Sequence, residues 1–177
     1  MNRRNAFTLI ELLITVSIIS ILASIAIVNL SLAGTRGKVA RAKSDMKTIA
    51  NSLEAYRVDY AACPPSAIGD IQLNAPLNAL TTPRAYITKV PDSAFGPAYF
   101  DFNPNMWMSG YNYKDRATTS VNMPAETYGY IWKALPYKEY MIHSCGPNRV
   151  WDVTPYHEYD PTNGVNSSGD ICIFGPM

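Results

Sequence analysis

The chain opens with an apolar run that extends from Phe7 to about Leu32 and contains a single charged side chain, Glu11. At a rise of 1.5 Å per residue, about 25 residues form a helix of roughly 37 Å, which exceeds the ~30 Å hydrocarbon core of a bilayer. A charged side chain at mid-depth in that core costs on the order of 2.5–3.5 kcal/mol. The pattern predicts one membrane-spanning helix, and Glu11 predicts a positively charged partner for that helix.

Helical periodicity continues beyond the apolar run. Apolar residues recur at spacings of three and four, and charged residues occupy the opposite face. We therefore expect one helix from about Phe7 to Tyr60, ended by the proline pair at 64–65. Gly34 and Gly37 each cost about 1 kcal/mol relative to Ala in a helix, so a bend or break is expected there. The predicted apolar stripe comprises Val39, Ala42, Met46, Ile49, Ala50, Leu53 and Tyr56.

Strand patterns appear in the second half of the chain. Alternating side chains predict strands at 128–133 and 140–145, joined by a short hairpin loop. Further short strands are predicted at 149–152 and at 99–102, and residues 77–80 are expected to form one helical turn. Three antiparallel strands laid across an amphipathic helix, with a loop-rich C-terminal tail, make an α+β domain.

Composition narrows the range of partners and suggests a crosslink. About 145 residues follow the apolar run, which is enough for one compact domain. The net charge is +1, so no broad electrostatic field favours nucleic acid.

The three cysteines are Cys63, Cys145 and Cys172. In an oxidising compartment we favour a Cys145–Cys172 disulfide, which would close a loop of about 27 residues and stabilise by about 3–4 kcal/mol, with Cys63 as an alternative partner for either.

The N-terminal residues point to a cleavage reaction. Residues 1–6 form a short basic segment that ends in Ala6. Cleavage after Ala6 would make Phe7 a new amino terminus with a pKa of about 7.7–8.0, and therefore a positive charge four residues from Glu11. The basic leader, the sequence F-T-L-I-E-L-L at 7–13 and the unbroken apolar run resemble the processing motif of type IV pilins and type II secretion pseudopilins. That family usually has Gly at the position of Ala6, so slower cleavage is expected here.

The resemblance implies a sequence of processing and assembly steps. A prepilin peptidase of the inner membrane would cut between Ala6 and Phe7 and methylate the new amine. Glu11 would pair with the amine of a neighbouring subunit as a pilin-like filament forms. The implied partners are further copies of the chain, the peptidase, the inner-membrane assembly platform, minor pseudopilins and membrane lipid, with no nucleic acid. The chain would span the inner membrane once, with its N-terminus cytoplasmic and its C-terminal domain periplasmic or extracellular.

Later segments are most similar to the major, G-type pseudopilin of type II secretion systems. The similar segments are 77–97, the turn at 144–148 and the C-terminal tail. This resemblance implies a structural subunit rather than an enzyme. It divides the chain into a leader (1–6), a transmembrane and filament-core helix (7–33), an amphipathic continuation of that helix (34–60) and an α+β globular domain (61–177).

The C-terminal tail carries the candidate metal ligands. Major pseudopilins bind one calcium ion in this region, and the resemblance implies Asp170, within Gly-Asp-Ile, and less closely Asp160 as ligands. Calcium takes six to eight oxygen atoms from carboxylates, amides and backbone carbonyls, and Asp152 and Asn163 could add to such a set. Asp, Asn and Gly are also the ordinary residues of turns, so a turn without metal is the alternative.

Two other functions share the features of the first 60 residues. A type IV pilus or competence pilin, used in adhesion, motility or DNA uptake, would carry a basic patch with salt-dependent affinity for DNA. A membrane-tethered periplasmic binding domain would not polymerise and would tolerate Glu11→Ala. The histidines and cysteines match no usual zinc-ligand spacing, and no glycine-rich phosphate loop is present. The residues therefore give no support to an enzymatic activity.

Overall fold

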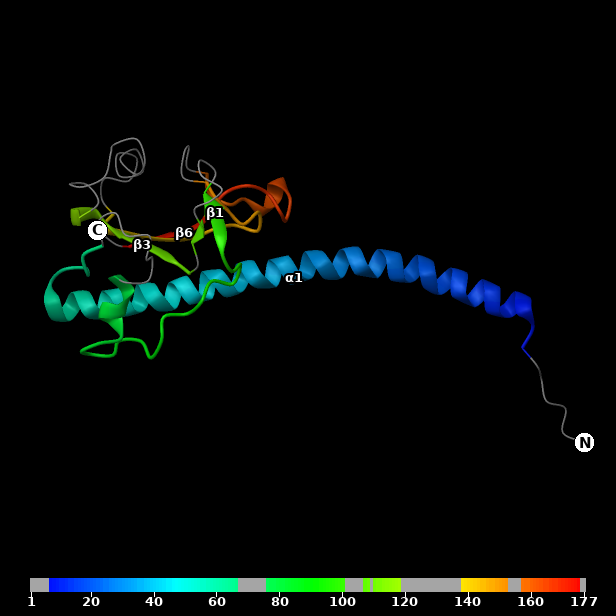
Figure 1. Cartoon of the computed structure of the whole chain (residues 1–177), viewed down its shortest axis with the longest axis horizontal. Helices are drawn as coiled ribbons and strands as arrows, with labels where there is room; N and C mark the ends of the chain where they lie inside the picture. Colours follow the sequence, from blue (N-terminus) through cyan, green and yellow to red (C-terminus); the bar gives the residue numbers. More distant parts are fainter. Residues whose placement is uncertain are drawn as a thin grey trace, which may run out of the picture.

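One long helix dominates the structure. The computed structural model describes residues 7–66, 76–100, 107–108, 110–118, 138–152 and 157–175 of the 177-residue chain. Helix α1 (Leu9–Tyr60) extends far beyond the domain at its N-terminal end (Figure 1). It is continuous across Gly34 and Gly37, so the expected break is absent. It ends where Ala61 adopts a left-handed conformation (φ 54°) and donates its backbone N–H to the Arg57 carbonyl.

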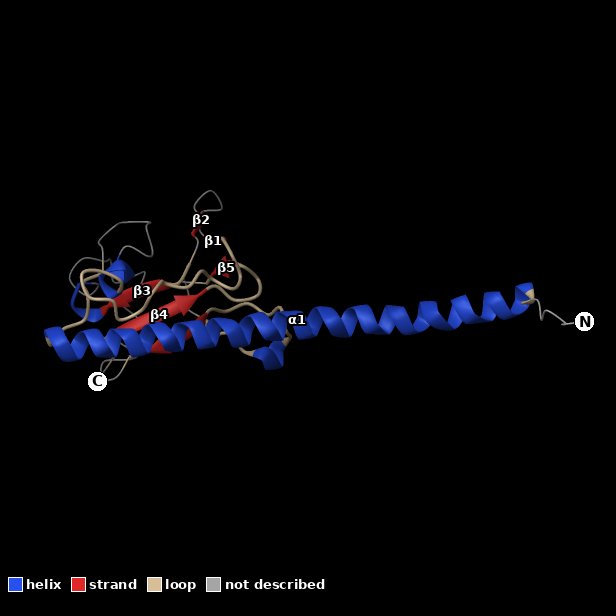
Figure 2. Cartoon of the chain, turned by 90° about the horizontal axis from the view of Figure 1, so that it is seen from below, coloured by secondary structure: helices blue, strands red, loops and turns tan. Residues whose placement is uncertain are grey.

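The C-terminal half of α1 forms one wall of the hydrophobic core. Ala42, Met46, Ile49 and Leu53 are fully buried, and the other members of the predicted stripe are partly buried. The strands lie along this half of the helix (Figure 2). Burying a side chain of the size of Leu or Ile stabilises by roughly 1.5–3 kcal/mol, so this face holds the domain on the helix.

The sheet that packs against α1 has three antiparallel strands. Its order is β3 (Asn112–Asp115), β4 (Tyr140–Ser144) and β6 (Ile171–Phe174). In the central strand, Ile142 lies opposite Tyr113 on one side and Ile173 on the other. All five residues of β4 are buried, because β4 is central and α1 packs against the sheet. The α+β fold predicted from the sequence is confirmed.

A second, smaller sheet lies beside the first. Strand β1 (Ala98–Phe100) pairs antiparallel with β2 (Trp107–Met108) and parallel with β5 (Val150–Trp151). The 3-10 helix η1 (Pro76–Leu80) places two leucines in the core, as the predicted helical turn required. A further 3-10 turn, η3 (Pro161–Asn163), lies in the C-terminal loop.

The predicted strands are confirmed only in part. The predicted strand at 140–145 is β4, but its neighbours β3 and β6 were not predicted as strands. The predicted strand at 149–152 is β5, which pairs in parallel with β1 in the second sheet instead of continuing the first. The predicted strand at 128–133 and most of its hairpin loop lie outside the described residues. The strand expected at 99–102 is found as β1, one residue earlier.

Candidate functional site

The first turn of α1 carries the candidate assembly site. Thr8 is the N-cap of the helix, and its hydroxyl accepts a hydrogen bond from the Glu11 backbone N–H at 3.3 Å. In return, Glu11 Oε2 accepts from the Thr8 backbone N–H at 2.9 Å and from the Thr8 hydroxyl at 2.7 Å. These reciprocal bonds form a capping box, which satisfies backbone N–H groups that a helix start leaves unpaired.

The capping box was missed in the sequence analysis. The pattern Thr-x-x-Glu directly before an apolar run is the sequence feature that predicts it. It gives Glu11 a local role, because the carboxylate helps to start the helix. Thr8 is neutral, however, so the negative charge of Glu11 is hydrogen-bonded without being neutralised. Among the described residues, no donor reaches its second oxygen, Oε1, which is available to a partner outside the chain.

Phe7 precedes the N-cap and is 76% exposed. Its position, one residue before Thr8, places it at the tip of the helix rather than in the domain (Figure 1). Ala6, the other side of the predicted cleavage bond, lies outside the described residues. The structure therefore brings Phe7 and Glu11 together at one helix end, where a liberated amine and a carboxylate would be presented on the same tip.

In the part of the chain that the structure describes, nothing covers the helix between Leu9 and Leu32. Its large apolar side chains are 50–80% exposed as far as Leu30, and an 18-residue window of α1 has a mean hydropathy of 2.5 with none of its residues buried. An exposed apolar surface of this extent marks a membrane or protein contact. At 1.5 Å per residue the segment is about 36 Å long, which is enough to cross a bilayer.

Polar side chains in this segment are satisfied inside their own helix. Thr15 donates its hydroxyl hydrogen to the Leu12 carbonyl at 2.8 Å, and Ser17 donates to the Leu13 carbonyl at 2.7 Å. Ser20 and Ser24 make equivalent bonds. Such bonds lower the cost of placing a hydroxyl in hydrocarbon. Glu11 differs from these hydroxyl groups because it carries a charge, and a group outside the chain is needed to neutralise that charge.

Comparison with known proteins identifies the family. The model of the prokaryotic N-terminal methylation motif matches residues 1–27. The chain is 30% identical over 111 residues to the type II secretion system core protein G of Aeromonas hydrophila, which covers 59% of this chain and 77% of that protein. The chain belongs to the type II secretion system core protein G family. The protein of the same name from Pseudomonas aeruginosa is 32% identical over 102 residues, or 55% of this chain and 72% of the relative.

A third core protein G, from Escherichia coli strain K12, is 28% identical over 108 residues and covers 58% of this chain and 74% of its own length. No solved structure matches the chain significantly. Membership of the core protein G family confirms the resemblance drawn from the F-T-L-I-E-L-L motif at 7–13 and identifies the fold as pilin-like. The relatives are named as core components of a secretion system, not as enzymes.

The two predicted calcium ligands occupy different surroundings in this core protein G family member. Asp160 is exposed and is the N-cap of η3, where its Oδ1 accepts from the Thr162 backbone N–H at 2.8 Å and the Thr162 hydroxyl at 2.7 Å. Asp170 is fully buried, and its Oδ2 lies 3.6 Å from His143 Nδ1. Burial raises the pKa of the Asp170 carboxyl above its ordinary value, although the adjacent His143 opposes that change.

Part of this donor set fits a hard cation. Asp170 Oδ2 is buried and has no hydrogen-bond partner among the described residues, and Asp152 Oδ2 accepts from the Gly169 N–H at 2.6 Å nearby. Within the described ranges, no group of three or more His, Cys, Asp and Glu side chains converges on one point. Calcium bound here would therefore need backbone carbonyls, which it accepts as ligands. Calcium binding at Asp160 and Asp170 stays a prediction.

The predicted disulfide is not formed in this structure, since none of the three cysteines is in a disulfide. The strand register gives the reason. Cys172 lies opposite His143, while Cys145 follows Ser144, the last residue of β4, which lies opposite Ile171. The two cysteines are therefore diagonal neighbours, for which Cα atoms are ~7–8 Å apart, and a disulfide requires about 4.4–6.8 Å.

Proposed function

We propose that the chain is a pseudopilin subunit of a type II secretion system, which polymerises through the N-terminal part of α1. The observation that carries the proposal is the apolar surface of the helix from Leu9 to Leu32, which the described part of the domain leaves uncovered and which bears one carboxylate at its tip. Family membership supports the same function. The apolar surface of such a helix is buried first in the bilayer and then against the helices of other subunits.

Processing comes before assembly in this proposal. The helix is inserted in the inner membrane with residues 1–6 cytoplasmic and the C-terminal domain outside. A prepilin peptidase cleaves between Ala6 and Phe7 and methylates the new amine of Phe7. The match of the N-terminal methylation motif to residues 1–27 supports this step. The products are a free leader and a subunit that presents a cationic amine at the tip of α1.

Glu11 then selects the position of each incoming subunit. Its Oε1 accepts a hydrogen bond from the charged Phe7 amine of a neighbouring copy, while Oε2 remains in the capping box with Thr8. Two unlike charges in a medium of low polarity compensate one another, whereas either alone is strongly unfavourable there. The pairing therefore favours extraction of a subunit from the bilayer only when another subunit is present. The assembly platform and minor pseudopilins are the other partners in this scheme.

The variant Glu11→Gln tests the proposal. Glutamine also completes a capping box, so it keeps the helix start while removing the charge. We expect normal membrane insertion and processing, with filament yield reduced to background in sheared-filament or crosslinking assays. Ser17→Ala is the matched control, because it removes a polar group of the same segment that already bonds to the Leu13 carbonyl. Unchanged filament yield from Glu11→Gln would contradict the role of Glu11 in assembly, and absence of filaments from the unsubstituted chain would favour a domain that is only tethered.

The processing step has its own measurement. Intact-mass and N-terminal analysis of the membrane-extracted protein is expected to give a chain that starts at methylated Phe7. A start at Met1, with the leader retained, or at Gly34, after removal of the apolar run as a signal peptide, would contradict the processing step. A chain that starts at Phe7 but forms no filament would leave processing intact and reject assembly.

A further inference from the structure

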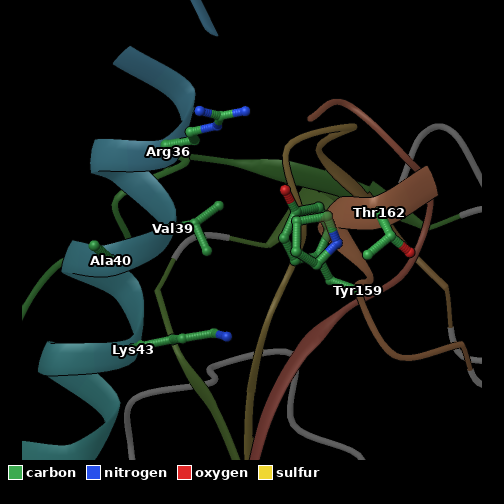
Figure 3. A pocket seen from close by; sticks show the side chains of 7 residues that line it. Arg36, Val39, Ala40, Lys43, Tyr159 and Thr162 are labelled. Carbon is green, nitrogen blue, oxygen red and sulfur yellow. The ribbon is translucent and has the colours of Figure 1, made fainter. Parts of the chain in front are cut away.

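A groove lies between α1 and the C-terminal loop, close to the point where the apolar segment of the helix ends. It encloses about 560 Å³. The helix supplies Arg36, Val39, Ala40 and Lys43, and the facing wall is formed by the loop that carries Tyr159 and Pro161 (Figure 3). The groove is separate from the Glu11 tip, and nothing in the assembly step uses it.

The four helix residues follow the spacing i, i+3, i+4 and i+7, so they lie on one face. Arg36 and Lys43 stand two turns apart and flank an apolar centre made by Val39 and Ala40. The side chains of both cations extend from the helix toward the side of Tyr159 in Figure 3. The site therefore combines two positive ends with an apolar middle.

The opposite wall is held in place by its own hydrogen bonds. Tyr159 is 7% exposed, its hydroxyl donates to the Val165 carbonyl at 3.1 Å, and its backbone N–H donates to the Asp170 carbonyl at 2.9 Å. The Ser167 hydroxyl donates to the Asp160 carbonyl at 2.9 Å, which closes the loop across η3. The groove is therefore formed before any ligand enters, and ligand binding would not have to order this wall.

Charge in this part of the helix is strongly positive. Residues 36–47 contain five cationic side chains and one acidic side chain, Asp45. Asp45 is engaged elsewhere, because it lies 3.6 Å from Arg41 and accepts from the Tyr111 hydroxyl at 2.9 Å. Across the described ranges, no carboxylate comes within 4 Å of Arg36 or Lys43, which leaves both charges available to an anion.

Asp160, which directly precedes the lining residue Pro161, does not neutralise the two cations. The Asp160 carboxylate turns toward Thr162, whose backbone N–H and hydroxyl both donate to Oδ1. These bonds lower the pKa of Asp160, so it remains an anion and would itself repel a free acidic segment of another protein. A small anionic group that enters along the helix from the membrane side is the remaining candidate ligand.

The distance from the membrane agrees with such a ligand. At 1.5 Å per residue, Arg36 lies about 6 Å along the axis beyond Leu32, the end of the apolar run, and the headgroup layer adds about 5–8 Å to each side of the hydrocarbon core. Lys43 lies about 10 Å further along the axis, beyond the headgroup layer, so the groove extends outward from the depth of the lipid phosphates.

We propose that this groove binds the headgroup of an anionic phospholipid while the helix is still in the membrane. Arg36 holds the phosphate, Lys43 holds the second anionic or hydroxyl group farther out from the bilayer, and the headgroup carbons between them lie against Val39, Tyr159 and Pro161. Inorganic phosphate lacks the apolar part that this lining accommodates. The inference rests on the membrane insertion included in the proposed function, and it adds a lipid class and a binding site to it.

The test uses the full chain reconstituted into phosphatidylcholine bilayers that contain a minor fraction of phosphatidylglycerol. Electron paramagnetic resonance of spin-labelled phosphatidylglycerol and phosphatidylcholine measures which lipid is motionally restricted by the protein. We expect a preference for phosphatidylglycerol that falls by about fivefold for each of the two cations removed, since a basic residue near an anionic surface contributes about that factor. The test variant is Arg36→Gln/Lys43→Gln.

The matched control is Lys38→Gln/Lys47→Gln, which removes the same charge from the same stretch of helix without touching the groove lining. Retained preference in the control and lost preference in the test variant support the proposal. Equal losses in both would show a general charge effect and overturn it. Displacement of the lipid by millimolar inorganic phosphate would assign the groove to free phosphate instead.

Two further outcomes separate this inference from the proposed function. A chain recovered in the aqueous fraction after carbonate extraction would refute membrane insertion itself. A chain that stays inserted, shows no lipid preference and loses filament yield in Arg36→Gln/Lys43→Gln would assign the groove to a second copy of the chain. In that case the lipid proposal fails and the pseudopilin function stands.

Discussion

The Tyr111 hydroxyl donates a hydrogen bond to Asp45 Oδ2 at 2.9 Å, and this bond joins the residue before β3 to the middle of α1. Tyr111 is fully buried, and burial together with the adjacent carboxylate raises the pKa of its phenol above its ordinary value. Hydrogen bonds to a charged group contribute roughly 1.5–3 kcal/mol. We expect Tyr111→Phe to lower the free energy of unfolding by an amount in this range, measured by denaturant titration of the domain.

Tyr60→Phe is the control for that change. Tyr60 lies at the C-terminal end of the same helix, where it is 51% exposed and stacks on Tyr56. Removing its hydroxyl leaves the ring contact in place, so stability should change by less than about 0.5 kcal/mol. Equal effects of the two substitutions would show that the link to Asp45 does not stabilise the domain.

Substitutions of Thr8 distinguish the two roles of Glu11, which are to cap the helix and to supply a charge for assembly. Thr8→Ala removes the N-cap hydroxyl and should cost about 1 kcal/mol of local helix stability, whereas Thr8→Ser keeps the bond. The charge of Glu11 remains in both variants, so both should assemble filaments, and Thr8→Ala should show faster amide exchange confined to the first turn. Loss of filaments in Thr8→Ala with normal filaments in Thr8→Ser would mean that the capping box, rather than charge alone, is required for assembly.

The helix and its two halves could be predicted because their patterns are long. A predominantly apolar segment of about 25 residues is long enough to cross a bilayer, which excludes most alternatives, and the stripe that contains Met46 and Ile49 repeats over five turns. The short strands could not be predicted in the same way. Strand β3 contains Asn112, Lys114 and Asp115, all buried, so polar residues occupy positions that a half-exposed strand would leave outside. Its burial comes from tertiary packing, which a local pattern does not record.

In the candidate sites too, features that lie close together in the sequence could be predicted, whereas features that depend on tertiary packing could not. Phe7 and Glu11 could be predicted as neighbours from their spacing of four residues and one unexplained charge, because Phe7 directly precedes the N-cap of the helix that carries Glu11. Pairing of Cys145 with Cys172 depended on a strand register that the sequence does not contain. The groove at Arg36 and Tyr159 joins segments more than a hundred residues apart, and no local sequence feature marks it.

Gly146 and Gly169 lack side chains and so allow the C-terminal loops to approach each other closely. A Cβ at Gly146 would overlap the Gly169 carbonyl oxygen, and Gly169 itself has φ +112° with Glu158 backbone atoms 2.8 Å from the place of a Cβ. Gly169→Ala should therefore destabilise the domain by several kcal/mol, through both strain and overlap. Gly37→Ala is the control, because nothing lies within 4 Å and the site is helical. It should instead stabilise by up to about 1 kcal/mol. Thermal melts of the two variants should move in opposite directions.

The buried thiol of Cys145 predicts how stability depends on alkaline pH. Burial raises the pKa of Cys145 to about 12, whereas an unfolded cysteine titrates near its ordinary value of about 8.5. Because the folded pKa is the higher one, the unfolded chain loses its proton first as pH rises. Stability is full below about pH 8.5 and falls toward about pH 12, with a slope of at most about 1.4 kcal/mol per pH unit from this group.

Denaturant midpoints measured across that pH window check the assignment. Cys145→Ala should flatten the decline by the contribution of one thiol, while tyrosine ionisation keeps part of the slope. Cys172→Ala provides a comparison at a less buried position of the neighbouring strand. An identical slope in the wild-type chain and in Cys145→Ala would show that the Cys145 thiol does not ionise differently on unfolding.

Substitution of Asp170 is the most direct test of calcium binding. A ligand that binds only the folded chain stabilises it by RT ln(1 + [L]/Kd), or about 2.7 kcal/mol at one hundred times Kd. If the buried Oδ2 of Asp170 is a ligand, millimolar calcium should raise the melting temperature, and Asp170→Asn and Asp160→Asn should each reduce the rise. Asp92→Asn is the control, because Asp92 is exposed and its carboxylate pairs with Lys89. An unchanged melting temperature in calcium, with magnesium giving the same curve, would leave Asp160 and Asp170 as turn and core residues only.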